Sequence, residues 1–156
     1  MSAVRLHSRS RGRKGAAAAS IPLAEDAGID PAFVAECPFQ ADFAATLQRS
    51  LRGFGAELVD GPLDTARKGR MLEVEILDLS TSGNGFIGRQ NYIRLRGTLY
   101  QDGRKVAVFF DKAPVPGGEW TSACYSVRSN LRAEAYYIRK WMENPVDGAK
   151  LKHIGE

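Results

Sequence analysis

Asp102-Gly103 constrains the fold of this chain more than any other feature, because it separates two runs in which apolar and polar residues alternate. An Asp-Gly pair between such runs is typical of a two-residue β-hairpin turn. Residues 90–100 form the run before the turn, and residues 105–110 form the run after it. The sequence therefore predicts an antiparallel hairpin at the centre of the fold.

A third strand is predicted at residues 71–79, where apolar residues alternate with Glu73 and Glu75. The strand before the hairpin turn carries Arg94 and Arg96 in the same alternating pattern. If the two strands are neighbours, the Glu pair lies opposite the Arg pair on the solvent face, as cross-strand ion pairs. The three strands then form an antiparallel meander with one apolar face and one solvated face.

Two helical segments are expected to cover the apolar face of the meander. Asp30-Pro31 is a typical helix start, and Gly53 marks the end of that helical region. A longer helix is predicted from a capping Ser122 to Asn144. Apolar residues recur at helical spacing in both segments: Phe43, Leu47, Leu51 and Phe54 in the first, and Cys124, Val127, Leu131, Ala135, Ile138 and Met142 in the second.

These elements predict an α+β fold, an antiparallel meander sheet of three to five strands packed by two helices in a single domain. The domain is expected to span residues 21–148, between a flexible basic tail at 1–20 and a C-terminal tail at 149–156. Residues 56–59 are expected to add a short strand, whereas residues 21–29 fit an edge strand or a loop. A chain of 156 residues with 44% hydrophobic content is long enough for one such core.

The positive charge of the chain lies in residues 1–20, which hold five basic residues and no acidic one: Arg5, Arg9, Arg11, Arg13 and Lys14. Removing these five charges from the net charge of +4 leaves the remaining residues at −1. A nucleic-acid-binding domain normally carries its basic footprint on the fold itself. The charge distribution therefore argues against nucleic acid as a partner of the fold. No apolar run approaches the roughly 18 residues of a membrane span, so we predict none.

A glycine-rich segment follows the first strand of the predicted meander and spells GxGxxG. In a dinucleotide-binding fold the next element is a helix, whereas here the next residues alternate with a period of two. A hairpin loop is the better interpretation, and its apolar tip is suited to binding a partner. We predict a binding loop made of Gly83, Asn84, Gly85, Phe86, Ile87, Gly88, Arg89 and Gln90.

Groups for catalysis or metal binding are scarce. The two histidines, His7 and His153, lie outside the predicted core, which disfavours Ser-His-Asp and Cys-His arrangements. Asp60 and Asp64 fall in a sequence typical of a turn. We therefore predict no catalytic residue, no metal site and no cofactor. An enzyme acting through Asp60, Asp64 or Asp78 is the least favoured alternative.

The last predicted helix mixes aromatic and basic residues: Tyr125, Arg128, Arg132, Tyr136, Tyr137, Arg139, Lys140 and Trp141. A surface that stacks nucleic-acid bases needs such residues on one open face. Helical spacing instead spreads them around the outer half of the helix, among Glu134 and Glu143. We predict a solvated amphipathic face.

Several segments, taken as an ordered set, resemble a family of uncharacterised bacterial exported proteins. These segments are ELVDGPLD, then GRMLEVEILDLSTSGNGFIGRQNYIRLRGTLYQDGRKVAVF, then a Gly-Gly loop, a cysteine and a long helix ending in WMENP. The family is similar to small α+β domains of unknown function in cell-envelope proteins and lipoproteins. The resemblance implies a leader-bearing protein and no enzyme activity.

The resemblance also bears on the two cysteines. From their number and spacing alone, Cys37 and Cys124 are either two buried free thiols or a bridged pair. Members of the family carry one cysteine early in the first helix and another at the start of the last helix. Cys37 and Cys124 match these places, so the resemblance implies a disulfide between them, of the kind that persists in the periplasm.

These observations favour a non-enzymatic bacterial cell-envelope protein whose partner is another envelope protein. It is expected to be periplasmic or secreted if a native leader precedes this sequence, and cytoplasmic otherwise. No lipid anchor is predicted, because no lipobox-like cysteine lies near residue 1. The alternative is a cytoplasmic nucleic-acid-binding protein that uses the basic residues of 1–20 as an arm.

Overall fold

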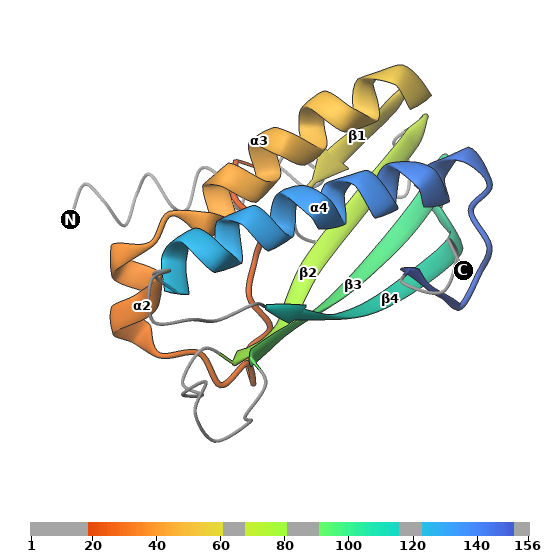
Figure 1. The fold of residues 1–156 in the computed structure, drawn as a ribbon. Helices are drawn as coiled ribbons and strands as arrows, with labels where there is room; N and C mark the ends of the chain where they lie inside the picture. The colour runs from red at the N-terminus through yellow and green to blue at the C-terminus, as the bar shows by residue number, and fades with distance from the viewer. Residues whose placement is uncertain (1–18, 61–67, 81–90, 116–122, 152–156) are drawn as a thin grey trace.

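A computed structural model describes residues 19–60, 68–80, 91–115 and 123–151. In chain order its elements are α2 (Pro31–Glu36), α3 (Phe39–Leu51), a 3-10 turn η1 (Arg52–Phe54), β1 (Ala56–Val59), β2 (Arg70–Ser80), β3 (Asn91–Gln101), β4 (Arg104–Val115), α4 (Ala123–Glu143) and β5 (Ala149–Lys150). The strands form one sheet in the order β1-β2-β3-β4-β5. The predicted single α+β domain is confirmed (Figure 1).

The sheet is mixed, so the prediction of a purely antiparallel meander is wrong. Strands β2, β3 and β4 are antiparallel as expected, but β1 runs parallel to β2 and β5 runs parallel to β4. Alternation of apolar and polar residues reveals a strand but not its direction. Only a tight turn, such as Asp102-Gly103, also shows that the next strand runs antiparallel. Neither parallel strand is joined to its neighbour in that way.

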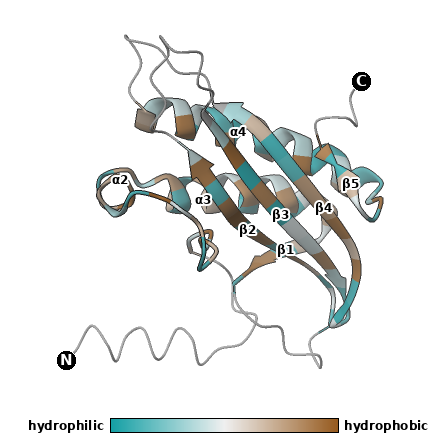
Figure 2. Cartoon of the chain, turned by 90° about the horizontal axis from the view of Figure 1, so that it is seen from below, coloured by the Kyte–Doolittle hydropathy of each residue, from teal (hydrophilic) through white to brown (hydrophobic). Residues whose placement is uncertain are grey.

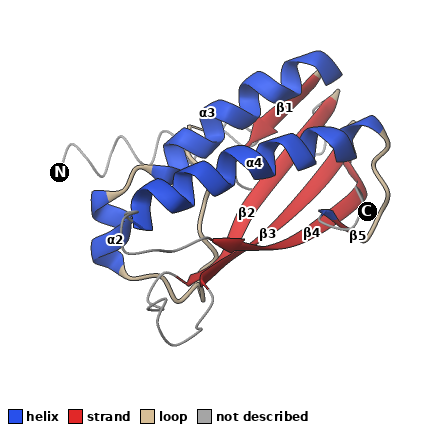
Figure 3. Cartoon of the chain, viewed as in Figure 1, coloured by secondary structure: helices blue, strands red, loops and turns tan. Residues whose placement is uncertain are grey.

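The sheet and the helices form two layers. Helices α3 and α4 lie side by side over one face of the sheet (Figures 1 and 3). Seen from below, strands β2 to β4 lie in front of both helices (Figure 2). The core fills the space between the layers: the apolar stripes of α3 and α4 are buried against the apolar residues of β2, β3 and β4. Burial of these stripes is the main stabilising contribution to the fold.

The central hairpin shows how individual residues set the register. Asp102 and Gly103 have φ values of 52° and 79°, as the predicted two-residue turn requires. Further along the hairpin, Gly97 lies opposite Phe109, whose ring occupies the space that a Cβ at Gly97 would need. The Phe109 ring also meets Trp141 of α4 edge to face, with 4.9 Å between ring centroids. This contact packs α4 onto the hairpin.

The predicted cross-strand ion pairs form in part. Glu75 lies opposite Arg96 and accepts a hydrogen bond from its guanidinium. Glu73 lies opposite Thr98, because the strands are antiparallel and Glu75 already lies opposite Arg96. Arg94 lies opposite Asp78, because the register shifts between Ile76 and Asp78. An irregularity of this kind moves every later pair by one residue, and apolar alternation does not reveal it.

Strand β4 is longer than predicted. It continues to Val115, although the sequence placed a connection from residue 111 onward. The sequence pattern missed this extension because of Asp111, which is only 5% exposed and lies opposite Leu95 in the sheet. A carboxylate at this buried position breaks the apolar pattern by which a strand is recognised.

Segments from both ends of the described chain close the edges of the sheet. Leu23 forms a parallel bridge with Ile76 of β2, and the Ile76 amide donates a 3.0 Å hydrogen bond to the Pro22 carbonyl. Part of residues 21–29 therefore joins the sheet. At the other edge β5 pairs with β4, and Leu151 is fully buried. The prediction of a tail from residue 149 is thus wrong for 149–151, because too few residues lie there to show a pattern.

Cys37 and Cys124 form a disulfide, with 5.6 Å between their Cα atoms. The pairing that the resemblance implies is confirmed. Cys37 lies between α2 and α3, and Cys124 lies in the first turn of α4. The bridge therefore ties the start of α3 to the start of α4 and aligns the two helices from that end.

Candidate binding groove between two helices

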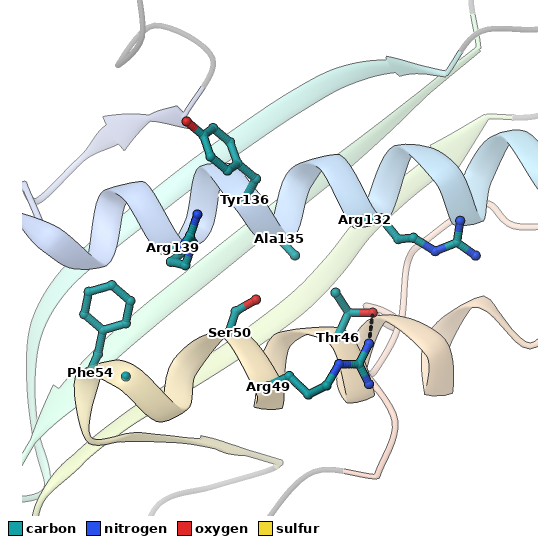
Figure 4. Close-up of a pocket in the computed structure, with 9 residues that line it drawn as sticks. Thr46, Arg49, Ser50, Phe54, Arg132, Ala135, Tyr136 and Arg139 are labelled. Atoms are coloured by element: carbon teal, nitrogen blue, oxygen red, sulfur yellow. Dashed lines mark hydrogen bonds between the residues drawn. The ribbon is translucent and has the colours of Figure 1, made fainter.

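A groove of about 600 Å³ lies between α3 and α4, and in the close-up of Figure 4 the strands of the sheet lie behind it. Its lining comes from three elements of the helical layer: Thr46, Arg49 and Ser50 of α3, Gly53 and Phe54 of η1, and Arg132, Ala135, Tyr136 and Arg139 of α4. Figure 4 shows arginine side chains on both walls of this groove.

The start of the groove is set by an ion pair between the helices. Arg128 of α4 donates from Nε to Oδ2 of Asp42 on α3, at 2.5 Å. One helical turn further along, Thr46 and Arg132 take the corresponding positions on the two walls. A hydroxyl therefore stands where the previous turn had a carboxylate, and in the part of the chain that the structure describes no ion pair is found for Arg132, the second arginine of α4.

The three arginines that line the groove carry charge that the protein does not neutralise locally. Arg49 donates to Oγ1 of Thr46 at 3.4 Å, and the Arg139 guanidinium lies 5.5 Å from the centre of the Tyr136 ring. Across the ranges that the structure describes, none of these guanidinium groups is within ion-pair distance of a carboxylate. Arginine binds carboxylate and phosphate groups through two parallel hydrogen bonds, so the walls are suited to an anion.

The floor of the groove is made by small residues. Ser50, Gly53 and Ala135 leave a depression between the helices, and a Cβ added at Gly53 would meet nothing within 4 Å. Phe54, which is half-buried, and Tyr136, which is 49% exposed, add aromatic surface. The groove thus combines positive walls with space for an apolar side chain.

Most residues singled out from the sequence lie elsewhere or outside the described residues. The predicted binding loop, Gly83 to Gln90, lies outside them, as do Asp64 and both histidines. Asp60 is exposed at the end of β1. Asp78 accepts a 3.0 Å hydrogen bond from the Tyr92 hydroxyl, which raises the pKa of Tyr92, and it has a structural role at the strand end.

Within those same ranges no group of three or more metal-binding side chains is found. No helix there is both long enough and apolar enough to cross a membrane.

Sequence reasoning missed the groove because one helix alone does not contain it. The aromatic and basic residues of α4 were predicted to form one solvated face. Trp141 is instead buried and donates from Nε1 to the Val146 carbonyl at 2.9 Å. Arg132, Tyr136 and Arg139 gather because α3 provides the second wall. The available signal was the seven-residue spacing of Arg132 and Arg139, which places both on one side of a helix.

Comparisons with known proteins assign neither a family nor a function to this chain. The sequence matches no known family, and a search of curated proteins found no match. One solved structure, described as "Crystal structure of uncharacterized protein", aligns with a TM-score of 0.44 and 12% sequence identity, over 80% of this chain and 81% of that chain. The resemblance to exported bacterial proteins stays a prediction.

Proposed function

We propose that this protein is a non-enzymatic binding domain of the bacterial cell envelope, and that it captures a partner protein in the groove between α3 and α4. The observation that carries the proposal is a set of three arginines on two walls of one open groove, none of which forms an ion pair with a carboxylate among the described residues. Charges left unpaired along a concave surface are what a complementary partner recognises.

The composition of the groove supports binding over catalysis. None of its nine lining residues is a carboxylate, a histidine or a cysteine. Thr46 and Ser50 supply hydroxyl groups, but no neighbouring base lines the groove to activate them as nucleophiles.

The Cys37–Cys124 disulfide supports an oxidising compartment. Cytosolic thiols are kept reduced, and stable structural bridges between them are rare in most bacteria. A periplasmic or secreted location follows from the bridge together with the predicted resemblance to exported proteins.

Photo-crosslinking in the periplasm tests the proposal. A crosslinking amino acid in place of Ser50 is expected to capture a partner, because this residue lies on the groove floor. The captured band should disappear when Arg49, Arg132 and Arg139 are all replaced by Gln. Lys105, an exposed residue of β4 outside the groove, is the matched control position. Equal capture at both positions, or capture that survives the triple replacement, would contradict the proposal.

The alternative function, nucleic-acid binding through the basic residues of 1–20, has its own signature. It predicts weak RNA or DNA binding that falls steeply with salt and disappears on deletion of residues 1–20. The groove proposal predicts that this deletion leaves partner capture at Ser50 unchanged.

A further inference from the structure

We propose that the partner enters the groove as an acidic polypeptide segment whose carboxylates pair with Arg132, Arg139 and Arg49. The inference rests on the proposed function and specifies the chemistry of the partner. It is argued from three features of the groove: the pattern of pairing between the helices, the distance between the arginines, and the charge of the surrounding fold.

The protein itself shows which chemistry satisfies an arginine at this interface. Arg128 of α4 is paired with the carboxylate of Asp42 on α3. One helical turn further along each helix stand Arg132 and Thr46, so the α3 position carries a hydroxyl in place of a carboxylate. A carboxylate brought by a partner would form with Arg132 the kind of ion pair that Asp42 forms with Arg128. The groove therefore begins one turn beyond the Arg128–Asp42 ion pair between the two helices.

The spacing of the arginines favours a segment over a single small anion. Arg132 and Arg139 are seven residues apart on α4, which is about 10 Å along the helix axis. Arg49 stands on the opposite wall. One carboxylate or phosphate spans only about 2–3 Å between its oxygens and meets one guanidinium in bidentate geometry. Several anionic groups along one chain can meet all three.

Charge and surface argue for a polypeptide over a nucleic acid. Residues 21–156 carry a net charge of −1, so this part of the chain has no overall positive charge that would attract a polyanion. A nucleic acid brings a phosphate at every nucleotide and binds through an extended basic surface. An acidic peptide can instead alternate carboxylates with apolar side chains, which fit against Phe54, Tyr136 and the small residues of the floor.

Fluorescence anisotropy on the intact, oxidised chain tests the inference. The probe is a fluorescein-labelled peptide about a dozen residues long that alternates Glu with Leu and Gly, and its neutral counterpart has Gln for every Glu. The acidic peptide is expected to bind, and the neutral peptide is not. Binding should weaken as the ionic strength rises, because added salt screens exposed charges.

Four variants place the binding in the groove. Arg132→Gln removes one wall charge, and Thr46→Glu supplies an internal carboxylate beside Arg49 and opposite Arg132. Each should weaken peptide binding by about tenfold, the effect of losing one charge-assisted hydrogen bond. Thr46→Gln has the size of Glu without its charge and should bind nearly as the original chain. Arg104→Gln, on the exposed end of β4, is the matched control for a lost positive charge. Equal thermal midpoints verify that the variants fold.

The outcomes separate this inference from the proposed function. Peptide binding that is unchanged in both Arg132→Gln and Thr46→Glu would overturn the acidic-segment assignment. So would Arg132-dependent binding of single-stranded DNA or of phosphatidylglycerol vesicles in the absence of peptide binding. If the acidic peptide does not bind but crosslinking at Ser50 still depends on the groove arginines, the proposed function is supported and the inference of an acidic segment is wrong. If both fail, both proposals fall.

Discussion

At the scale of single residues, the closest fit in the core is between Gly97 and Phe109. A Cβ at Gly97 would lie 2.0 Å from Cε2 of the Phe109 ring. The glycine is thus required by its neighbour, since no backbone angle at this position excludes other residues. The same ring stacks edge to face with Trp141, so it cannot move aside without loosening α4.

Gly97→Ala should lower the free energy of unfolding by about 1–3 kcal/mol, because one extra methyl group forces the Phe109 ring out of its packed position. Urea denaturation measures the change. Gly53→Ala is the matched control, since a Cβ there enters open space, and its effect should be close to zero or slightly stabilising. Equal stability of the two variants would contradict the packing argument.

The ionised Asp102 side chain in the hairpin turn makes the stability of the fold depend on pH. The backbone amide of Gly69 donates to Oδ1 of Asp102 at 2.7 Å. This bond lowers the pKa of Asp102, helped by the Gln101 side chain and by the charge of Lys68. A lowered folded-state pKa stabilises the fold above the ordinary carboxyl value of about 3.9, and this stabilisation is lost as the pH falls through the lowered value.

Asp102→Asn should therefore be less stable than the original chain near neutral pH and equally stable in strong acid. Asn tolerates the positive φ of this position, so the comparison isolates the charge. Denaturation at a series of pH values measures the difference. A stability difference that persists unchanged to the lowest pH would mean that the charge of Asp102 contributes nothing.

At the scale of elements, the helical layer is held by two connections near one end. The Cys37–Cys124 disulfide and the Arg128–Asp42 ion pair both connect the N-terminal end of α3 to the N-terminal part of α4. Beyond them, the two helices separate enough to leave the groove with its small-residue floor. The same elements therefore supply both the fixed end of the layer and its open binding surface.

Reduction of the disulfide should destabilise the protein by at most about 4–5 kcal/mol in the chain-entropy model, because the bridge closes a loop between cysteines 87 residues apart. Thermal unfolding with and without a reductant measures the loss. In the C37S/C124S variant the reductant should have no further effect. Two alkylatable thiols in the unreduced, denatured protein would contradict the bridge.

At the scale of the whole molecule, local sequence patterns predict individual strands, turns and helices. They do not predict features that depend on the pairing of segments far apart in the chain. The hairpin at Asp102-Gly103 and the stripe along α4 follow from local patterns, and both are present. The parallel placement of β1 and β5 depends on connections without a tight turn. The groove depends on two helices, α3 and α4, that are more than 70 residues apart in the chain. No periodicity within either helix indicates that their arginines face a common space.

The closure of the sheet by the end segments has a consequence for synthesis. A chain that emerges from its N-terminus leaves the outer edge of β4 open at Phe109 and Phe110 until Ala149 and Lys150 pair with them, and all of α4 comes in between. An open strand edge is a template for pairing with another chain. A chain that stalls or is cleaved between Glu143 and Ala149 would retain both long helices and every long strand, and would still offer that edge to its neighbours.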